Sequence, residues 1–237
     1  MKKLLFLTGL LLSLTGCTVY HPQAVDIPLI NHAGDTRVDA SLSMSSWVVV
    51  PDAVNINATV SHGFNGWLTG QVHLNYGGDN WFGQVAPGYY FPMGDNSVFE
   101  FYVGYGYGGA NRDDKDDNRE KFSGFYHLPF AQANVGFHDL TRINLDFGFG
   151  IKVGAFFPDY EYHKFDSDGI EALSKYEHYT KSNILFEPQL MVRFGSEKVK
   201  FNVKLGIAWL SNFVNDNDND HMIYDFSTAS CGFTFAF

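Results

Sequence analysis

The run Ile143-Asn-Leu-Asp-Phe-Gly-Phe-Gly-Ile-Lys-Val-Gly-Ala155 decides the fold class of this chain. Its odd positions carry only apolar side chains, and its even positions carry glycine, asparagine, aspartate or lysine. Successive side chains of a β-strand point to opposite faces, whereas an α-helix repeats about every 3.6 residues. The run therefore predicts a strand with one wholly apolar face and one face that is small or charged.

The same alternation recurs along the chain, most clearly in Phe99–Tyr107 and Val199–Trp209. Most of the runs are about ten residues or longer, which is the length of a tilted strand that crosses a bilayer. Helical periodicity is confined to a possible short loop helix at Ile170–Tyr179. The alternation predicts ten strands, near residues 37–48, 53–62, 67–77, 80–91, 98–110, 122–137, 142–156, 182–195, 198–212 and 222–237.

Short and long connections alternate between these strands. The short ones are 93–96, 138–141 and 196–197, and the long polar ones are 111–121, 158–181 and 214–221. Outer-membrane barrels have short periplasmic turns and long external loops, and an even strand count puts both ends of the barrel on the turn side. The pattern therefore predicts that both termini are periplasmic.

The last strand ends in an aromatic alternation, Phe233, Phe235 and Phe237, that resembles the terminal signature of barrels inserted by the outer-membrane assembly machinery. In strand pattern, residues 20–237 resemble the small outer-membrane barrels of the OmpA/OmpX-like kind. With Tyr20-x-Pro22 and Pro28-Leu29 the chain also resembles uncharacterised barrel lipoproteins of Bacteroidetes. The resemblance implies an all-β, antiparallel up-and-down transmembrane barrel of about ten strands, eight to twelve being possible, in the outer membrane of a Gram-negative bacterium.

The N-terminus has the anatomy of a signal peptide. Lys2 and Lys3 precede a short apolar stretch that ends in Leu14-Thr15-Gly16-Cys17, and this stretch is too short for a spanning helix. Those four residues resemble a bacterial lipobox. The resemblance implies that residues 1–16 are removed and that Cys17 is diacylated; an ordinary secretory signal is the alternative. The even strand count, which puts both termini on the turn side, places this lipid in the inner leaflet of the outer membrane. Residues 17–36 are then a lipidated tether, and residues 37–237 are the barrel.

The composition bears on which face meets lipid. Aromatic residues make up 17% of the chain, there are 24 glycines, and only 18% of residues are charged. Glycine-rich faces are a poor solvent coat but suit a crowded barrel interior, so we expect the apolar faces to point outward into lipid. The alternative is a soluble periplasmic lipoprotein whose apolar faces form the core and bind an apolar ligand.

With the polar faces inward, acids and bases in equal number enter the lumen, and buried charges are costly unless paired. We therefore expect a charge network there. Four large side chains also point inward, Tyr90, Tyr102, Tyr126 and Phe130, so the lumen is expected to be plugged or narrow and the chain not to be a general porin. The expected network consists of Asp39, Glu100, Asp146, Lys152, Glu187, Arg193, Lys200 and Lys204.

Two charged stretches suggest ion contacts. Asp216, Asp218 and Asp220 have the spacing that opens a calcium loop, but His221 replaces the turn glycine and Ser227 the bidentate glutamate. An EF-hand is thus excluded, and weak divalent-cation binding or a solvated loop tip remain. The second stretch is a mixed-charge loop whose bases suggest contacts with lipopolysaccharide phosphates, bridged by divalent cations, or a hydrated loop. Its bases are Arg112, Lys115, Arg119 and Lys121.

The longest predicted loop interleaves aromatic and charged residues. Loops of this length are usually functional or disordered, so its aromatic and histidine side chains are candidates for a contact surface. His163 and His178 with Glu161 or Asp166 have metal-ligand chemistry, but their spacing does not fix a site. The contact candidates are Tyr160, Tyr162, His163, Tyr176 and Tyr179.

Catalysis finds little support in the sequence. Ser61 and His62 are neighbours in a strand and therefore point to opposite faces, and no nucleophile-elbow, zincin or P-loop motif occurs. A net charge of −10 argues against nucleic acid. We expect a non-catalytic outer-membrane barrel lipoprotein with an envelope or surface-interaction role, no cofactor, and membrane lipid, lipopolysaccharide and the assembly machinery as partners. A narrow transport or ligand-binding barrel, the soluble lipoprotein and a lipid-modifying enzyme are the alternatives.

Overall fold

The computed structural model describes residues 20–23, 26–45, 54–114, 120–165, 173–212 and 226–237. Within these ranges the regular structure is entirely β, and no helix is long and apolar enough to cross a membrane. The strands are β1 (Thr36–Ser45), β2 (Val54–Gly63), β3 (Leu68–Gly77), β4 (Asn80–Pro92), β5 (Ser97–Asp114), β6 (Glu120–Phe137), β7 (Asp146–Phe165), β8 (Leu173–Tyr179), β9 (Asn183–Gly195), β10 (Val199–Ile207), β11 (Trp209–Asn212) and β12 (Ser227–Ala236).

Ten of these strands close into an antiparallel up-and-down barrel. Neighbours in sequence pair from β1 to β7, β7 then pairs with β9, and β10 and β12 complete the circuit. The barrel closes where β12 pairs with β1, from Arg37 with Ala236 to Ser45 with Thr228. The remaining two strands are additions: β8 pairs with β7, and the short β11 pairs with β9 beyond the end of β10. The predicted fold class is confirmed.

The predicted strand positions are close to the observed ones, but two predicted loops are largely strand. β5 continues to Asp114 and β6 begins at Glu120, so most of the expected loop 111–121 is a hairpin. β7 continues to Phe165 and pairs with β8, so the expected loop 158–181 is strand over residues 158–165 and 173–179. The possible short helix at Ile170–Tyr179 is wrong for its described residues, 173–179. Charged residues interrupt the apolar alternation there, but the backbone ladder continues past the apolar part of the wall.

The apolar faces of the strands point outward. Phe147 is 40% exposed and Phe233 is 52% exposed, while Phe149, Phe201 and Phe235 are half-buried on the same outer surface. Large apolar side chains of neighbouring strands continue this surface, whereas the inward faces carry many buried polar side chains beside smaller apolar clusters. The buried polar side chains include Asn57, Thr59, Gln71, His73, Gln84, Gln132 and Asn134.

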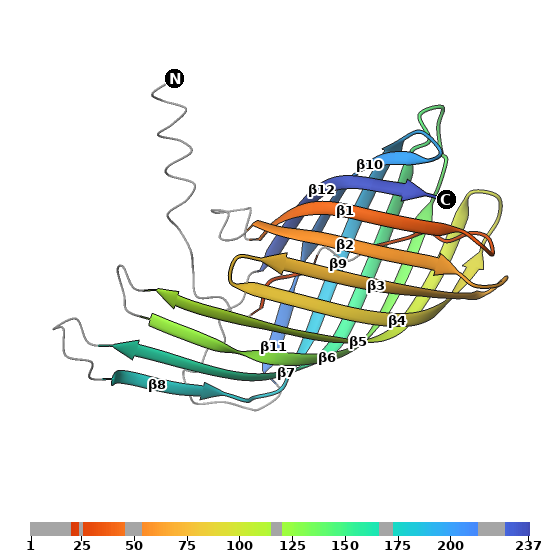
Figure 1. Cartoon of the computed structure of the whole chain (residues 1–237). Helices are drawn as coiled ribbons and strands as arrows, with labels where there is room; N and C mark the ends of the chain where they lie inside the picture. Colours follow the sequence, from red (N-terminus) through yellow and green to blue (C-terminus); the bar gives the residue numbers. More distant parts are fainter. Residues whose placement is uncertain (1–19, 24–25, 46–53, 115–119, 166–172, 213–225) are drawn as a thin grey trace, which may run out of the picture.

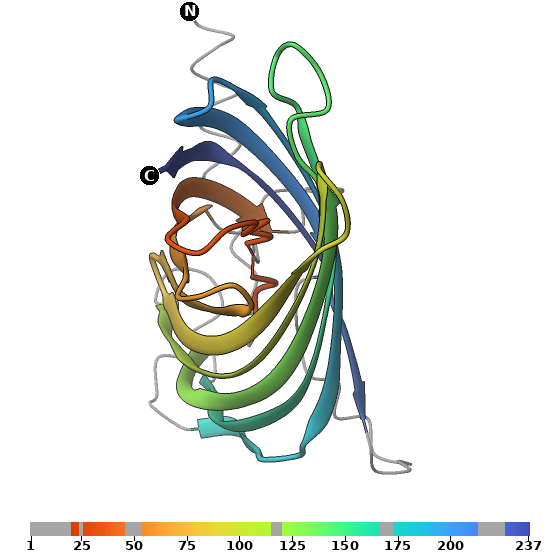
Figure 2. The ribbon, with the colours of Figure 1, turned by 90° about the vertical axis from the view of Figure 1, so that its right-hand side faces the viewer.

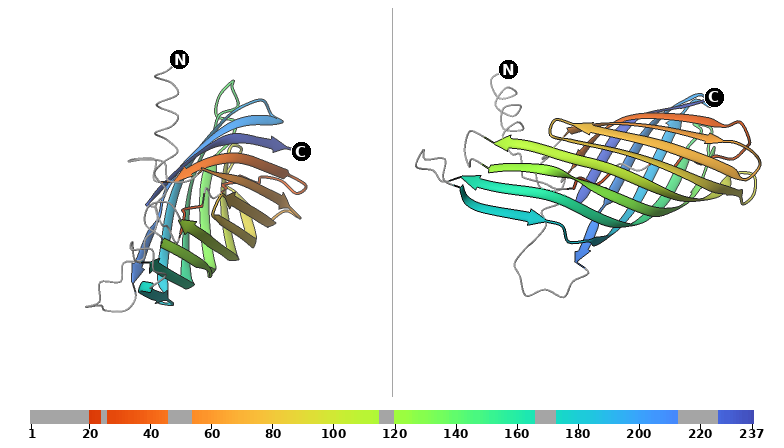
Figure 3. Two further views of the ribbon diagram at one scale, coloured as in Figure 1. Left: turned by 60° about the vertical axis from the view of Figure 1, so that its left-hand side comes forward. Right: turned by 60° about the horizontal axis from the view of Figure 1, so that its bottom comes forward.

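The two ends of the barrel differ. We call the end with connections 64–67, 93–96, 138–145 and 196–198 the turn side, and the opposite end the loop side; β1 begins and β12 ends at the turn side. On the loop side β5, β6 and β7 extend beyond β1–β4, and β8 lies along the outer edge of this extension (Figures 1 and 3).

Aromatic side chains mark both rims of the outer surface. Near the turn side, Trp67 stacks on Tyr89 with ring centroids 5.2 Å apart. Near the loop side, Trp81 meets Tyr107 edge to face at 5.3 Å, and Tyr107 lies 5.9 Å from Phe125. Such rims are typical of the two interfaces of a membrane-spanning barrel, where an apolar ring body and a polar edge face different media.

The segment that precedes β1 lies inside the barrel. Figure 2 shows this part of the chain, in red to orange, within the ring of strands. Tyr20, Leu29 and Ile30 are fully buried, and Ile27 is 1% exposed. The prediction that residues 17–36 are only a tether between lipid and folded domain is therefore wrong for residues 20–23 and 26–30, which lie in the lumen.

Candidate functional site

Glycines in the barrel wall make room for the apolar side chains of this lumen segment (residues 20–23 and 26–35). A Cβ placed on Gly148 would lie 2.9 Å from Cγ2 of Ile27, and one on Gly136 would lie 2.5 Å from Cδ2 of Leu29. Real Cβ contacts are longer than this, so a side chain at either wall position would meet the segment. The glycine-rich inner faces therefore have a packing partner that alternation alone does not reveal.

Two wall arginines bind backbone carbonyls of the lumen segment. Arg193 donates to the carbonyl oxygens of Ile27 and Pro28 at 2.9 and 3.0 Å, and Arg37 donates to that of Leu29 at 3.3 Å. These carbonyls lie inside the barrel, where an unpaired backbone oxygen would be costly. The guanidinium groups therefore replace the partners that a β-ladder would supply.

Wall amides and a carboxylate bind the segment further along. Gln189 donates to the carbonyl of Gln23 at 2.7 Å, and Gln132 donates to that of Asp26 at 3.1 Å. The backbone N–H of Gln23 in turn donates to Glu187 at 3.3 Å. These groups come from β6 and β9, so the wall contacts the segment's backbone from more than one side.

Glu100 binds the turn-side end of the segment. One of its carboxylate oxygens accepts a hydrogen bond from the backbone N–H of Ile30 at 2.7 Å, and the other accepts one from Asn134 at 3.0 Å. Glu100 is fully buried. The hydrogen-bonding capacity of this buried acid is thus met by neutral donors, one of which belongs to the lumen segment.

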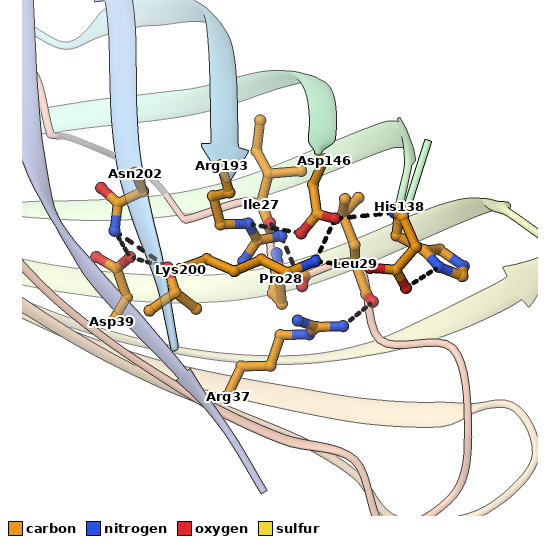
Figure 4. Close-up of polar contacts among 12 residues, drawn as sticks. Ile27, Pro28, Leu29, Arg37, Asp39, His138, Asp146, Arg193, Lys200 and Asn202 are labelled. Carbon is orange, nitrogen blue, oxygen red and sulfur yellow. Dashed lines mark hydrogen bonds and ion pairs between the residues drawn. The ribbon is translucent and has the colours of Figure 1, made fainter. Parts of the chain in front are cut away.

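A cluster at the turn side is organised around Asp146. This carboxylate lies 2.6 Å from Nζ of Lys200 and 3.4 Å from Nε of Arg193 (Figure 4). Lys200 also contacts Asp139 at 2.8 Å, and the backbone N–H of Asp139 donates to Asp146 at 3.1 Å. The cluster therefore joins β7, β9, β10 and the connection that precedes β7, and through Arg193 it reaches the lumen segment.

Asp139 is the member of this cluster that lies in a connection and faces water. Partial burial raises the pKa of its carboxyl group, but hydrogen bonds from Lys200 and His138 and the positive charge of Lys200 outweigh this effect, so the net pKa is lowered. The side chain is 47% exposed. Its pairing is thus an ion pair at the rim of the barrel rather than in its interior.

A second cluster surrounds Asp39 in the middle of the lumen. One oxygen of Asp39 lies 2.8 Å from Nζ of Lys204, and the other accepts hydrogen bonds from Asn202 at 2.6 Å and Thr234 at 2.9 Å. Lys204 also lies 3.2 Å from the carboxylate of Asp26, which belongs to the lumen segment. The cluster therefore connects β1, β10 and β12 to residue 26.

A third cluster receives Tyr20 toward the loop side. The Tyr20 hydroxyl donates to Glu187 at 2.8 Å, and its ring meets those of Phe156 and Tyr126 edge to face at 5.2 and 5.6 Å. Lys152 lies 3.7 Å from Glu187. The Tyr20 ring is therefore held by two aromatic side chains, and its hydroxyl is held by a carboxylate that pairs with Lys152.

The eight charged residues predicted for the lumen all lie inside the barrel, but in separate clusters. Lys152 with Glu187, Lys200 and Arg193 with Asp146, and Lys204 with Asp39 are close, while Glu100 pairs with neutral donors. The inward direction predicted for Tyr90, Tyr102, Tyr126 and Phe130 also agrees with their burial. The residues that the alternation does not identify are those of the lumen segment, Tyr20 and Asp26 above all.

The predicted contact residues of the long connection divide between two faces of the β7–β8 hairpin. The register pairs Tyr160 with Tyr179 and His163 with Tyr176. Tyr160 is fully buried and packs with the interior aromatic cluster, against which Tyr162 and Tyr179 also lie. Only His163 and Tyr176 are on the outward face, so the five residues do not form one surface.

The outward face of this hairpin is polar and holds its own contacts. His178 lies 2.8 Å from Asp159, and His163 lies 3.6 Å from Glu161. The rings of His163 and Tyr176 meet edge to face at 4.9 Å. Phe157 precedes these residues on the same face of β7 and is 43% exposed, so the outer surface changes from apolar to polar at this level.

Candidate metal and modification sites fall partly outside the described ranges. Asp216, Asp218, Asp220 and Cys17 lie outside them, as do Lys115 and Arg119, and Arg112 is placed only as backbone. Among the side chains that are described, no group of three or more His, Cys, Asp or Glu is arranged to hold a metal ion.

Ser61 and His62 do not form a catalytic pair. Ser61 is fully buried on the lumen face, whereas Nδ1 of His62 contacts the Thr36 hydroxyl at 2.8 Å and its ring lies 5.0 Å from that of Phe64. In the lumen, Nδ1 of His73 contacts the hydroxyl of Thr59 at 2.8 Å. Neither arrangement brings a nucleophile to an oriented base and acid.

No protein-family model matches the chain, and no curated protein matches it either. Solved structures of outer-membrane barrels are similar to it at low identity. They include the KdgM porin (9% identity, 85% of this chain and 99% of that chain, TM-score 0.37), the translocator domain of autotransporter NalP from Neisseria meningitidis (10%, 87% and 90%, 0.42), and the NanC porin (11%, 86% and 99%, 0.34).

Proposed function

We propose that this chain is an outer-membrane barrel lipoprotein that is closed by its own N-terminal segment and has an envelope role rather than that of a general porin. The observation that carries the proposal is the occupied lumen. Residues 20–23 and 26–30 lie inside the barrel, and wall side chains bind their backbone from Gln23 to Ile30. A ten-stranded barrel has little interior space beyond that of its own side chains, so one further segment of chain is enough to block the lumen.

The outer surface supports the membrane location. Its apolar side chains would be costly in water, and the aromatic rims lie where the bilayer interfaces would be. The terminal alternation Phe233, Phe235, Phe237 supports insertion by the barrel assembly machinery, and the Leu14–Cys17 motif supports a lipid anchor at Cys17. Membrane lipid is then the first partner of the protein.

The loop-side extension supports a contact surface outside the membrane. Asp159, Glu161, His163 and His178 alternate outward above the apolar wall, at the level where lipopolysaccharide head groups or another envelope component would lie. Lys121 is exposed and pairs in register with His163, so a base accompanies the acids. Divalent cations bridging the acids to phosphates fit this chemistry. The proposed role needs neither a cofactor nor a catalytic residue.

Single-channel recording in planar bilayers tests the closed lumen. The purified full-length protein is expected to insert without producing steps of porin size, because the segment and the side chains bound to it occupy the lumen. Steady currents of porin size from the wild-type protein would contradict the proposal. Insertion is verified on the same membranes by protection of the barrel from added protease.

A gated narrow path is the second candidate, and one observation favours it. Most of the contacts that hold the segment are polar contacts to its backbone, and such contacts are individually modest and exchangeable with water. A protease site placed at the exposed residues His32–Gly34 allows the segment to be cut from β1 after insertion and then washed out with urea. Current after the wash favours a gated path, whereas continued silence favours a barrel that is closed permanently.

A further inference from the structure

The lumen segment crosses the barrel in one direction. At its beginning, the ring of Tyr20 contacts Phe156 and Tyr126. Phe156 pairs in register with Asn183, the residue at the loop-side end of β9. At its end, the backbone of Gly34 donates to the carbonyl of Gly63, the last residue of β2 at the turn side. The chain therefore runs from the loop side to the turn side before it reverses into β1.

The contacts between these ends follow the same order. Gln23 meets Glu187 and Gln189, whereas Ile27 meets Arg193, further along β9 toward the turn side. Figure 4 shows Ile27, Pro28 and Leu29 beside the turn-side cluster of Asp146 and Lys200. Later residues of the segment thus contact wall residues nearer to the turn side. The direction of the segment rests on several independent contacts.

The reach of the chain then limits where Cys17 can be. Cys17 lies three positions before Tyr20, and even a fully extended chain spans only about 10 Å over three residue steps. From Glu187, which binds the Tyr20 hydroxyl, β9 continues to Gly195 at the turn side. At roughly 3.3 Å per residue this is about 26 Å of strand. Cys17 therefore cannot reach the turn side while Tyr20 keeps its contacts with Glu187, Phe156 and Tyr126.

We propose that the chain enters the barrel from the loop side, so that Cys17 and its lipid lie at the outer surface of the outer membrane. The inference rests on the proposed function, which supplies the membrane and the lipid. It replaces the expectation, drawn from strand count, that both termini are periplasmic: Thr36 and Phe237 are at the turn side, but the segment before Thr36 returns through the lumen.

This placement has a consequence for anchoring. The segment lies inside a wall that is closed by the pairing of β12 with β1. Once closed, the barrel holds the two acyl chains on the side of the loop-side extension. Two acyl chains give stable membrane anchoring, so the N-terminus would add a second attachment in the outer leaflet to that of the barrel itself.

Cysteine labelling of intact cells tests the direction. The variant Val19→Cys is made in a Cys231→Ser parent, which removes the exposed free thiol, and is treated with a membrane-impermeant maleimide before and after permeabilisation of the outer membrane. Matched controls are Asn111→Cys on the loop side and Glu197→Cys in a turn-side connection, both at exposed positions. The parent alone reports any reaction at Cys17.

The expected result is that Val19→Cys and Asn111→Cys react to the same extent in intact cells, whereas Glu197→Cys reacts only after permeabilisation. Reaction of Val19→Cys only after permeabilisation, or only after the barrel is unfolded, would overturn the inference while leaving the membrane location intact. Equal reaction of both controls in intact cells would instead overturn the proposed location, and this inference with it. A reactive parent would show that Cys17 carries no lipid.

Discussion

Arg193 is the residue at which the barrel wall and the lumen segment depend on each other. Its guanidinium group is fully buried, lies 3.4 Å from Asp146 and donates to the carbonyl oxygens of Ile27 and Pro28. A buried ion pair gains little over an apolar pair, but removing one partner is destabilising. Without Arg193, Asp146 would keep only Lys200, at 2.6 Å, of its two basic partners. The backbone carbonyls would lose their donor at the same time.

We therefore expect Arg193→Ala to lower the free energy of unfolding by about 3 kcal/mol or more. The measurement is urea unfolding of the protein in detergent or lipid vesicles. Arg142→Ala is the matched control, since Arg142 lies exposed in the connection before β7, and surface substitutions usually stay within about 0.5 kcal/mol. Equal stability of the two variants would show that Arg193 does not bind the segment as described.

Asp139 makes stability depend on pH at the turn-side rim. Its pKa in the folded protein is lowered, mainly by hydrogen bonding to Lys200 against a partial burial that raises it. The unfolded chain therefore binds a proton at a higher pH than the folded one. The stabilisation is fully present above the ordinary pKa of about 3.9 and is lost as the pH falls through the lower folded value.

The variant Asp139→Asn is expected to remove this part of the acid dependence. Asn tolerates the positive φ of 54° at this position, so the backbone is not strained by the change. Unfolding midpoints of both proteins between pH 6 and pH 2.5 are the measurement. The gap between wild type and variant should narrow as the pH falls below about 4; a gap that stays constant over this range would refute the assignment.

The sequence predicts which residues face the lumen but not which of them meet. Alternation assigns Asp39 and Lys204 to inner faces, and both are buried. Their contact at 2.8 Å crosses β12, which separates β1 from β10, and so depends on the tilt and stagger of the closed barrel. Tyr20 and Asp26 could not be placed at all, because the segment that carries them has no strand period and takes its position from the wall.

At the scale of elements, the lumen segment and the glycines of the wall are complementary. A Cβ on Gly148 would lie 2.9 Å from Ile27 and 3.0 Å from Met191, and all of these neighbouring atoms belong to side chains. Gly148→Val should therefore displace the segment without distorting the backbone of the wall. Overpacking of this kind costs roughly 1–3 kcal/mol.

The test compares urea unfolding of Gly148→Val with that of Gly66→Ala, a turn-side position where a Cβ meets nothing within 4 Å. Gly148→Val is expected to be the less stable variant, and Ile27→Ala is expected to restore part of the loss when the two changes are combined. Additive destabilisation in the double variant would mean that Ile27 does not occupy the space in front of Gly148.

The hairpin of β7 and β8 shows why strand ends were predicted less well than strand centres. Tyr160 and Tyr162 continue the inward alternation of β7, but Asp159, Glu161 and His163 replace its apolar outward residues. Apolar residues recur on the outward face only where that face would contact lipid. The apolar alternation therefore ends where lipid contact would end. Backbone pairing needs no lipid, so the strands continue into the loop-side extension under polar side chains.

At the scale of the whole molecule, the arrangement of a soluble protein is inverted. Apolar side chains face outward and cover the outside of the wall, whereas polar and charged side chains face the lumen, and the ion pairs and the lumen segment are inside. This arrangement is stable only where hydrocarbon surrounds the wall. The sequence alternation predicts this inversion, because a face rich in glycine would cover a protein poorly in water. The alternation cannot show that a segment of the same chain occupies the lumen.

A charge placed on the outer wall tests this inversion directly. Val72 lies in the middle of β3, is 49% exposed, and pairs in register with Val60 and Val85 of the neighbouring strands. Val72→Arg is expected to cost about 2–4 kcal/mol in lipid vesicles, because an arginine at the bilayer midplane loses its hydration. Glu197→Arg, in an exposed turn-side connection, is the control and should be nearly neutral. If Val72→Arg proved as harmless as the control, the outer wall would have to face water, and the proposed membrane location would be wrong.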